Sequence, residues 1–545
     1  MVTQDFENRT RQMIDSLKGI CASYGLGNDG NEFKIITQVF LYKFLNDKYA
    51  FEAKKIRPAL AKAEGWEQAL SELNANDLEM LQLQMGPDTA RLRPEHFIKQ
   101  LYNRQNAPQF AKLFDDTLLD IAISNNDIFA VKTDGGAKIT LFDRVSEYIT
   151  DHSKRDGFCR AIINTLAEFS FERIFTQKYD FYATLFEYLI KDYNKDSGGK
   201  YAEYYTPHAV AKIMAAILVP EGVRGKVKSV SCYDPSAGSG TLLMNLAHAI
   251  GEQRCTIYSQ DISQKSSGLL RLNLILNNLV HSIPNIIQGN TLTHPYHRDG
   301  RVLKKFDYIV SNPPFKMDFS DFRNDLDSKE NKERFFAGVP NIPKKATEKM
   351  AIYQLFVQHI IFSLKPGGKA AVVVPTGFIT AQSGIEKSIR KHLIDKKMLA
   401  GVVSMPSNIF ATTGTNVSIL FIDRSNKEGV VLIDGSNLGT KIKDGKNQKT
   451  LLSEKEEDHI VTTFNRKKAV EGFSVVVEYD EIAQKNYSFN AGQYFDVKIE
   501  YMDLTPVQFA AKMRGFSDNL ENLFKKSAGM DREIRKQLAG VRFAR

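Results

Sequence analysis

The sequence lacks the features that mark several classes of protein. Its four cysteines, at positions 21, 159, 232 and 255, form no CxxC pair, which argues against a structural zinc site and favours a reducing compartment. The N-terminal stretch is polar and unlike a signal peptide, and no apolar run is long enough to span a bilayer. We therefore expect a cytoplasmic protein with no metal site and no association with a membrane.

The sequence has only a small excess of positive charge. The 545 residues include 73 Lys and Arg against 64 Asp and Glu, which gives a formal net charge of +9. This balance permits a nucleic-acid partner, but it is spread over a long chain and is weak evidence for one. With 43% hydrophobic and 25% charged residues, the sequence is typical of a soluble globular protein with a large core and several domains.

The hydrophobic pattern divides the chain into three regions. Residues 1–170 are expected to form a helical domain, because apolar residues between Phe33 and Phe44 recur at helical spacing. In residues 171–440, short apolar runs alternate with helical segments, which predicts a doubly wound sheet with helices on both faces. Residues 441–545 are more polar and end in a basic helical tail. The expected fold class is α/β, with a helical domain before the sheet and a helical tail after it.

Polar loops follow four of the expected strands. The four are a glycine-rich loop at 234–241, Asp261, the Gly289-Asn290-Thr291 turn, and Asn312-Pro313-Pro314-Phe315. Because the carboxyl ends of parallel strands share one edge of a sheet, we expect these loops to lie close together. An acidic residue about 20 residues after a glycine loop suits the hydroxyl pair of a ribose. The lysine of a P-loop is missing after Gly240, which argues against an ATP site.

The most informative of these loops is Asn312-Pro313-Pro314-Phe315. It ends the apolar run at 308–310 abruptly, since prolines cannot donate the hydrogen bonds of a strand ladder. The amide oxygen of Asn312 and a fixed main-chain carbonyl can accept both hydrogens of an exocyclic amino group. The ring of Phe315 can stack on a flat heterocycle. Alone, the turn is equally compatible with a simple strand end; beside the other loops, it predicts a pocket for a planar base that carries an amino group.

The rest of the central region gives weaker signals. The charged segment at 316–350 is expected to be a mobile loop that the substrate orders, because long irregular loops beside a site are usually functional or disordered. A strand at 369–374 and two last strands, at 402–405 and 416–422, complete the expected sheet. Phe410 and residues 412–415 lie between these last strands and could reach the site.

In this order, the loops resemble the motifs of S-adenosylmethionine-dependent amino-methyltransferases that act on DNA. Tyr204-Tyr205-Thr206-Pro207, upstream of the glycine loop, is similar to the extra cofactor motif of the adenine-N6 branch. From about Phe33 to Tyr494, the chain resembles the modification subunit of type I restriction–modification systems. The motifs are specific as a set, and the terminal regions match more loosely.

The resemblance implies a cofactor, S-adenosyl-L-methionine, and a role for each residue that matches a motif. The cofactor-binding residues would be Glu203, Tyr204, Tyr205, Thr206, Pro207, His208, Asp234, Ala237, Gly238, Ser239, Gly240, Thr241, Asp261, Asn290 and Thr291. The catalytic residues would be Asn312, Pro313, Pro314 and Phe315. Asn312 and the carbonyl of Pro313 would hold the amino group of an adenine flipped out of the duplex, and Phe315 would stack on its ring. Asp261 stands where glutamate is commoner in the family, which puts only the cofactor affinity in question.

The resemblance also implies partners. Double-stranded DNA would be the substrate, and a separate DNA specificity subunit, which carries two copies of this chain, would choose the target site. A restriction and translocase subunit is a further candidate partner, because no lysine-containing P-loop is found here. The amphipathic tail offers apolar residues such as Phe509, Phe516 and Leu523 for packing against another chain. The expected function is therefore site-specific DNA adenine-N6 methylation within a type I complex.

Three other functions remain open for the same motifs. Protein-glutamine methyltransferases use a similar Asn-Pro-Pro-aromatic pocket, since a side-chain amide also has a planar amino group. Cytosine-N4 methylation uses the same pocket, and a non-enzymatic assembly module that has kept the fold is the third. Cytosine-C5 methylation is set aside, because its nucleophilic cysteine sits next to a proline and none of the four cysteines has that neighbour.

Overall fold

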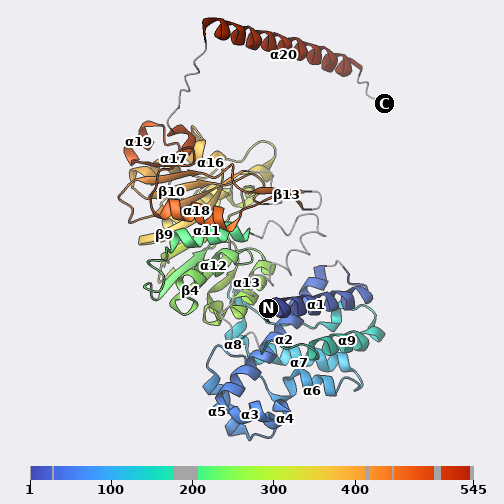
Figure 1. The fold of residues 1–545 in the computed structure, drawn as a ribbon. Helices are drawn as coiled ribbons and strands as arrows, with labels where there is room; N and C mark the ends of the chain where they lie inside the picture. The colour runs from blue at the N-terminus through green and yellow to red at the C-terminus, as the bar shows by residue number, and fades with distance from the viewer. Residues whose placement is uncertain are drawn as a thin grey trace. The chain divides into compact units, whose positions relative to one another are not determined.

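The computed structural model describes residues 2–27, 30–172, 175, 206–410, 416–444, 447–495 and 505–540. The chain forms two compact units, Met1–Tyr494 and Phe495–Arg545, which we describe separately (Figure 1). Glu203, Tyr204 and Tyr205 of the expected cofactor motif lie outside the described residues, as do residues 411–415.

The front of the first unit is helical, as the sequence predicted. Its helices are α1 (Val2–Ser23), α2 (Gly30–Ile56), α3 (Pro58–Lys62), α4 (Trp66–Ser71), α5 (Ala75–Met85), α6 (Ile98–Asn103), α7 (Phe110–Ser124), α8 (Asn126–Phe129) and α9 (Arg155–Ala167). Local signals set several helix ends. Pro58 occupies the first turn of α3, and the side chain of Asn74 accepts the N–H of Asp77 at the start of α5.

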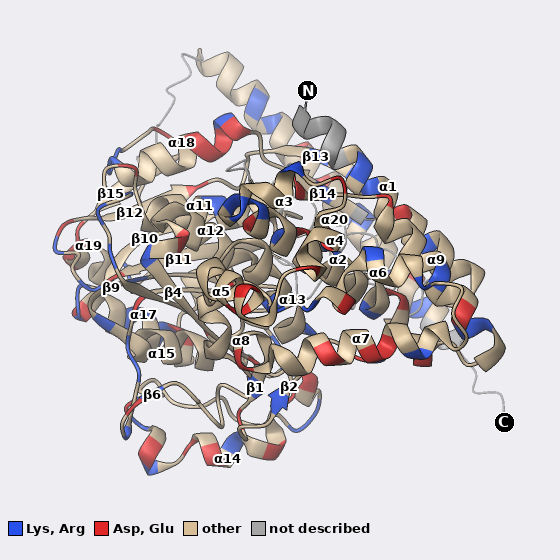
Figure 2. Ribbon diagram, turned by 90° about the horizontal axis from the view of Figure 1, so that it is seen from below, with Lys and Arg blue, Asp and Glu red and all other residues tan. Residues whose placement is uncertain are grey.

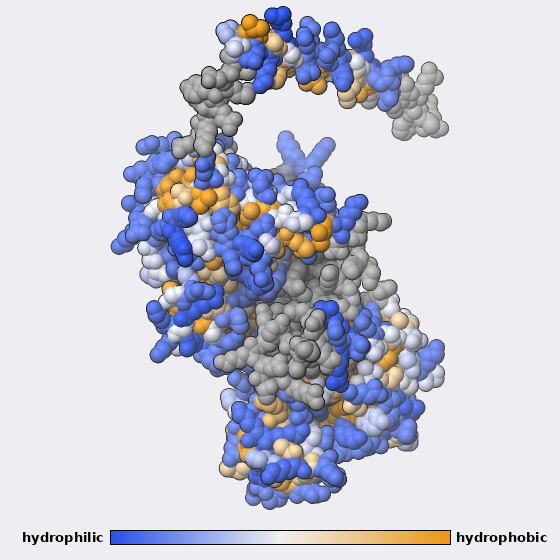
Figure 3. Space-filling view, in the orientation of Figure 1, coloured by the Kyte–Doolittle hydropathy of each residue, from blue (hydrophilic) through white to orange (hydrophobic). Residues whose placement is uncertain are grey.

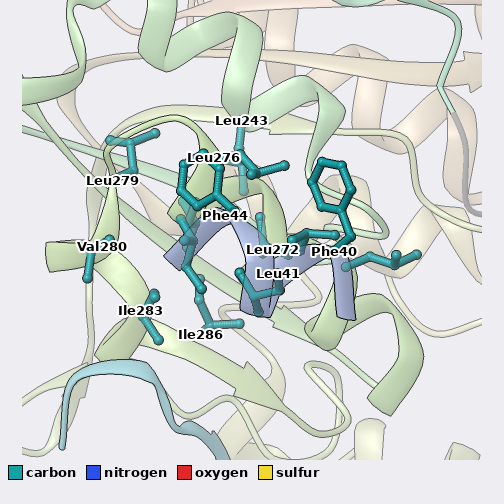
Figure 4. Packing of buried hydrophobic residues seen from close by; sticks show 14 of the residues in the cluster. Phe40, Leu41, Phe44, Leu243, Leu272, Leu276, Leu279, Val280, Ile283 and Ile286 are labelled. Carbon is teal, nitrogen blue, oxygen red and sulfur yellow. The ribbon is translucent and has the colours of Figure 1, made fainter. Parts of the chain in front are cut away.

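Helix α2 packs against the α/β part of the same unit. Figure 4 shows Phe40, Leu41 and Phe44 of α2 beside Leu272 and Leu276, which belong to helix α13 (Gln264–Leu276). All five side chains are buried. The helical region and the sheet therefore share one hydrophobic core, and burial of this apolar surface holds them together.

At the centre of the first unit, the described residues form a mixed sheet of eleven strands, which confirms the expected α/β class. In spatial order the strands are β15 (Ser474–Val477), β12 (Val430–Asp434), β10 (Leu399–Ser404), β11 (Val417–Asp423), β9 (Leu364–Pro375), β8 (Phe306–Ser311), β3 (Val230–Asp234), β4 (Cys255–Asp261), β5 (Ile286–Gln288), β1 (Val131–Thr133) and β2 (Lys138–Ile139). From β9 to β1 the neighbouring strands are parallel. Two hairpins are separate from this sheet: β6 (Arg298–Asp299) with β7 (Val302–Leu303), and β13 (Thr440–Asp444) with β14 (Asn447–Leu451).

Helices cover both faces of this sheet. They include α11 (His208–Leu218), α12 (Thr241–Ile250), α13, α15 (Tyr353–Ser363), α16 (Gly377–Thr380), α17 (Gly384–Asp395), α18 (Glu454–Asn465) and α19 (Tyr479–Gln484). The connections through α12 and α13 move one way along the sheet, and the connection through α15 moves the other way. Right-handed crossovers therefore place α15 on the face opposite α12 and α13. Helix α11 packs on α12 and α18 (Figure 1). Within the described ranges, no helix is both long and apolar enough to cross a membrane.

The sheet is wider than the sequence predicted. Strands β1 and β2, from the region expected to be helical, extend one end of it. At the other end, β12 and β15 lie beyond the two strands expected to be last, so that expectation was wrong. Strands β1 and β2 have three and two residues, which is too short for the alternation of a strand to be recognised in the sequence. Backbone pairing with β5, such as Lys132 with Ile287, draws β1 into the sheet.

The segment at 316–350 is packed, so the expectation of a mobile loop was wrong. It forms short helical turns, including α14 (Arg323–Leu326), around a hydrophobic cluster of its own. The cluster joins Phe319, Leu326 and Phe335 to Leu355 and Phe356 of α15, all of them buried. Phe319 and Phe335 of this segment are therefore core residues.

The described part of the second unit is a long helix, α20 (Pro506–Gly540), which confirms the expected helical tail. Phe509, Met513, Phe516, Leu520 and Leu523 are all exposed. Their spacings of four and three residues place them on one stripe of the helix, the pattern of a coiled-coil seam. Figure 3 shows apolar residues in orange among the blue polar residues of this helix.

A buried arginine ties the front region to the sheet. Arg271 of α13 donates from Nη1 to the carbonyls of Ile139 at 3.0 Å and Thr140 at 2.9 Å. Burial lowers the pKa of Arg271 to about 10, which still leaves it charged at neutral pH. The guanidinium thus holds the strand region around β2 against α13 through charge-assisted hydrogen bonds.

We expect Arg271→Met to lower the free energy of unfolding by about 2–4 kcal/mol, because it leaves buried carbonyls without donors. Urea denaturation followed by circular dichroism measures this change. Arg301→Met, at an exposed position, is the control and should change stability by no more than about 0.5 kcal/mol. Equal stability of the two variants would show that the Arg271 contacts do not hold these regions together.

Candidate functional site

The expected site lies where the order of the parallel strands reverses. The chain runs from β3 to β4 and β5 in one direction, then returns to place β8 on the other side of β3. Asp234 ends β3 and Ser311 ends β8, so the glycine loop and the Asn312 turn start side by side. Doubly wound sheets bind ligands at the carboxyl edge beside such a reversal.

A cavity of about 300 Å³ opens at this edge. Its lining includes Thr206, Asp234, Ala237, Gly238, Ser239, Thr241, Asp261, Asn290, Thr291, Asn312 and Pro314 of the residues expected to form the site. Residues from all four polar loops, which are far apart in the sequence, therefore meet around one space. Its volume lies at the lower end of the range for small-molecule sites, about 300–1,000 Å³.

The glycine loop is shaped by close packing against α13. Gly240, the N-cap of α12, has φ of 84°, and a Cβ at this position would lie 2.2 Å from Cδ1 of Leu270. Only glycine avoids both this contact and the cost of a left-handed conformation. The side chain of Asn273, also on α13, donates to the carbonyl of Ser239 at 2.8 Å. The loop thus presents Ser239 and Thr241 to the cavity at the N-terminus of α12, where anionic groups are favoured.

Asp261 is held between two backbone N–H groups. Its Oδ2 accepts from Gly238 at 2.9 Å and its Oδ1 accepts from Ser263 at 2.8 Å. Burial raises the pKa of Asp261, which the two backbone hydrogen bonds oppose. A carboxylate has about four acceptor sites, so both oxygens can also accept hydrogen bonds from ligand hydroxyls. This arrangement fits a pair of vicinal hydroxyls such as those of a ribose.

Asp234 links the two central strands. It is buried, and its Oδ1 accepts from the N–H of Ser236 at 2.9 Å and from Oγ of Ser311 at 3.0 Å. The hydroxyls of Ser236 and Ser311 lie 2.7 Å apart. Burial raises the pKa of Asp234 to about 7, and the nearby charge of Asp261 adds to the increase. This carboxyl therefore titrates near neutral pH.

The Asn290–Thr291 turn forms another wall of the cavity. Oδ1 of Asn290 accepts from the N–H of Leu292 at 3.0 Å, and Oγ1 of Thr291 donates to the carbonyl of Pro235 at 2.7 Å. These bonds fix the turn against the glycine loop. The amide nitrogen of Asn290 remains a donor for a ligand on this side of the cavity.

A residue that the sequence did not single out, Arg334, holds this turn from behind. It is buried and donates to the carbonyls of Leu292 at 2.7 Å and Thr291 at 2.8 Å. Its Nε donates to Nδ1 of His359 at 3.0 Å, and Nε2 of His359 lies 3.2 Å from the hydroxyl of Tyr233. Burial lowers the pKa of His359 well below its ordinary value, so the ring is neutral. The segment at 316–350 is thereby bonded to β3.

Asn312 connects the expected catalytic turn to the upstream motif. Its Nδ2 donates to Oγ1 of Thr206 at 3.3 Å, across more than a hundred residues of sequence. Because the amide nitrogen is used in this way, Oδ1 is the atom that can accept a hydrogen bond from a ligand. Pro314 lines the cavity beside it. Asn312 therefore lies at the cavity, and its role as an acceptor for an amino group stays a prediction.

Five other expected residues do not line the cavity: Pro207, His208, Gly240, Pro313 and Phe315. Phe315 is half-buried and meets Tyr353 edge-to-face, with ring centroids 6.2 Å apart. Its stacking on a base therefore stays a prediction. Pro207 is the N-cap of α11, which begins at His208.

The cavity also has an apolar wall that the sequence analysis missed. It consists of Met317, Phe322, Ile352 and Phe356, with Asp318 at its margin. Met317 and Phe322 come from the 316–350 segment, Ile352 is the N-cap of α15, and Phe356 lies within α15. Aromatic rings at the wall suit a flat heterocycle. The aromatic residues of that segment were a usable signal, but nothing in the sequence placed them against the glycine loop.

Comparison with known proteins agrees with this site. The model of the family described as N-6 DNA Methylase matches residues 177–502. The MpnII methylase subunit of a type I restriction enzyme from Mycoplasma pneumoniae is 31% identical over 334 residues, which cover 60% of this chain and 59% of that subunit. The HindI methylase subunit from Haemophilus influenzae is 24% identical over 449 residues, or 79% of this chain and 92% of that subunit. The match therefore spans about three-fifths of the Mycoplasma subunit and most of the Haemophilus one.

A solved structure shares the fold. The methyltransferase subunit of a type I restriction–modification system from Streptococcus thermophilus matches with a TM-score of 0.70 and 21% identity, over 91% of this chain and 100% of that chain. The doubly wound sheet and the ordered loops at its carboxyl edge define the amino-methyltransferase class. The chain belongs to the N-6 DNA methylase family, whose model matches more than half of it. Its resemblance to type I modification subunits is confirmed.

The pKa of Asp234 predicts a pH dependence of stability. Between its ordinary value of 3.8 and about 7, the folded protein keeps a proton that the unfolded chain loses. The free energy of unfolding should therefore fall as pH rises through this window, by up to about 1.4 kcal/mol per unit. Asp234→Asn removes the titration, so its stability relative to the wild type should increase from pH 5 to about pH 7 and then level off.

Denaturant unfolding of both proteins over this pH range measures the difference. The control is Asp321→Asn, at an exposed position, which removes a carboxyl group elsewhere and leaves Asp234 in place. A constant difference for Asp234→Asn would show that its carboxyl has an ordinary pKa.

Proposed function

We propose that this chain transfers the methyl group of S-adenosylmethionine to the N6 amino group of an adenine in DNA, as the modification subunit of a type I restriction–modification system. The observation that carries the proposal is the meeting of Asp261 and Asn312 at one cavity. One is suited to a ribose and the other to an amino group. Membership of the N-6 DNA methylase family and the type I relatives support it.

The residues present fit the proposed cofactor. Asp261 would accept the two ribose hydroxyls, and the N–H of α12 with Ser239 and Thr241 would receive the carboxylate of the methionine part. The apolar wall with Phe322 and Phe356 would hold the adenine ring, with Asn290 at its edge. When bound, the cofactor would supply a methyl group already activated by its sulfonium. Asp234 would carry part of the negative charge that suits that cation.

The target base would be held by the Asn312 turn. Oδ1 of Asn312 and the carbonyl of Pro313 would accept the two N6 hydrogens, which increases electron density on the nitrogen and directs its lone pair at the methyl group. The donor bond from Asn312 to Thr206 fixes the acceptor before the base arrives. A base inside the duplex could not bring its amino group to an acceptor at this cavity, so the reaction would require base flipping.

We expect two substitutions to separate binding from chemistry. Asp261→Ala should weaken S-adenosylmethionine affinity at least about tenfold, because it removes charge-assisted hydrogen bonds. Asn312→Ala should keep that affinity and lower methyl transfer to DNA at least about 100-fold, since it removes an acceptor needed at the reacting nitrogen. Calorimetry and transfer of labelled methyl groups measure the two effects.

The matched control is Asn324→Ala, on the exposed side of α14, which should change neither quantity. Full methyl transfer by Asn312→Ala would remove this residue from the mechanism. Unchanged cofactor affinity in Asp261→Ala would remove the carboxylate from the cofactor site.

We further infer that α20 binds the DNA specificity subunit. The exposed stripe from Phe509 to Leu523 has the seven-residue repeat of a coiled-coil seam and is available to pack against another helix. No groove reader such as a helix-turn-helix or zinc finger is recognised in this sequence. Sequence choice would then belong to the partner, with two copies of this chain bound to it.

Charges placed on the stripe should break this assembly. Phe516→Glu with Leu520→Glu puts two carboxylates into the seam, whereas Ala511→Glu with Asn522→Glu puts two on the opposite side of the same helix. We expect the first pair to abolish the complex with the specificity subunit and the second to leave it intact, with cofactor affinity equal in both. Size-exclusion chromatography with light scattering gives the masses; a full-strength complex with the first pair would exclude α20 as the binding element.

A further inference from the structure

A second surface of the α/β region carries charge in an unusual arrangement. Basic and acidic residues are interspersed over the helices in the view of Figure 2, so net charge alone does not mark a DNA surface. The β13–β14 hairpin differs, because residues 440–451 include four lysines and one aspartate. Lys441 and Lys443 of β13 are exposed, and within the part of the chain described neither forms an ion pair. The hairpin therefore presents uncompensated positive charge.

The hairpin emerges from the same edge of the sheet as the cavity. It follows β12, which is parallel to β10, and β10 is antiparallel to β11, which is antiparallel to β9. Strands β12, β9 and β8 therefore point the same way, and Asp434, at the end of β12, lies at the edge that carries Asn312. Four strand spacings of about 4.8 Å separate β12 from β8, or about 19 Å along that edge. The strands of the hairpin continue outward from the sheet (Figure 1).

The base of the hairpin is held firmly. The N–H of Thr450 donates to the carbonyl of Asn408 at 3.0 Å, and its hydroxyl donates to the carbonyl of Ser407 at 2.6 Å. Gly439 has φ of 84°, and its N–H donates to Oε1 of Glu456 at 2.7 Å. A Cβ on Gly439 would lie 2.6 Å from Cγ2 of Thr450, so the strands meet closely here. The hairpin is thus anchored to the β10–β11 loop and to α18.

The strand register puts the lysines on a defined face. Lys441 pairs with Thr450, and Lys443 pairs with Gln448. Because side chains alternate along a strand, these four lie on one face of the hairpin. Thr450 on that face contacts the β10–β11 loop, and β10 lies between β12 and the strands of the cavity. Lys441 and Lys443 therefore lie beside the loop that follows β10, at the edge of the sheet that carries the cavity.

We propose that the β13–β14 hairpin binds the phosphate backbone of the DNA duplex beside the target base, through Lys441 and Lys443. This inference rests on the proposed function, because it places the duplex whose flipped base enters the cavity. One turn of B-DNA spans about 34 Å, so the distance of about 19 Å between β12 and β8 corresponds to about half a turn of the duplex. Phosphates that flank the flipped base therefore lie within reach of the hairpin. A two-stranded ribbon is also narrow enough to follow the major groove. Lysines supply affinity by releasing counterions from phosphates and carry no sequence information.

The test uses the full-length chain and a fluorescent 30-base-pair duplex. Lys441→Gln with Lys443→Gln is compared with Lys396→Gln with Lys427→Gln, two exposed lysines in loops that precede β10 and β12 at the opposite edge of the sheet. Both pairs remove the same charge. We expect the hairpin pair to reduce the slope of log affinity against log salt by about 1.8, or about 0.9 for each lost phosphate contact, and the control pair to leave it unchanged.

Two further measurements make the outcomes distinct. Cofactor calorimetry must give the wild-type affinity for both variants, which shows that the sheet edge is folded. Methyl transfer is also measured with the specificity subunit present. We expect the Lys441→Gln and Lys443→Gln variant to have a Michaelis constant for DNA about tenfold higher than the wild type, with little change in turnover. Equal salt slopes for the two variant pairs would overturn the hairpin proposal. If the wild type binds DNA but methylates none, the proposed function is overturned and the comparison of the hairpin variants remains valid. If the wild type binds no DNA, both proposals are overturned.

Discussion

The site depends on the hydrogen bonds that join the ends of β3 and β8. Ser311 donates to Asp234, and its hydroxyl lies 2.7 Å from that of Ser236, so the glycine loop and the Asn312 turn leave the sheet from one fixed point. Asp234 and Ser311 are buried, and leaving a buried polar group without its hydrogen bond costs about 1–3 kcal/mol. The part of the cavity suited to a cofactor and the part suited to an amino group therefore cannot shift independently. This is the constraint that a reaction between two bound molecules needs.

Two buried arginines extend this constraint through the first unit. Arg271 joins α13 to the region around β2, and Arg334 joins the 316–350 segment to the Thr291 turn. Removing a guanidinium from water is costly, and burial lowers the pKa of each to about 10. Arg271 donates to backbone carbonyls, and Arg334 donates to two backbone carbonyls and to Nδ1 of His359. These acceptors fit only one placement of the surrounding chain. Hydrogen bonds of this kind fix the relative position of neighbouring segments more strictly than apolar packing alone.

From the sequence we could predict which loops follow a strand and so share one edge of the sheet. We could not predict which residues reach the site because a distant segment packs against that edge. The glycine loop, Asp261, Asn290 and Asn312 each follow a strand, so one rule about sheet edges was enough to bring them together. Arg334 and Phe356 carry no local signal, because their roles depend on how the 316–350 segment packs on α15. The short strand β1 was missed for a related reason: its pairing with β5 depends on a segment more than a hundred residues away.

The most direct measurement of the central claim is mass spectrometry of nucleosides from DNA methylated in vitro. The full-length chain, its specificity subunit and a duplex would be incubated with S-adenosylmethionine whose methyl group carries deuterium. Our account predicts N6-methyldeoxyadenosine with the labelled methyl group, at defined sites. Label in N4-methyldeoxycytidine would assign the Asn312 turn to a different base, and label in protein glutamine with none in DNA would contradict the account.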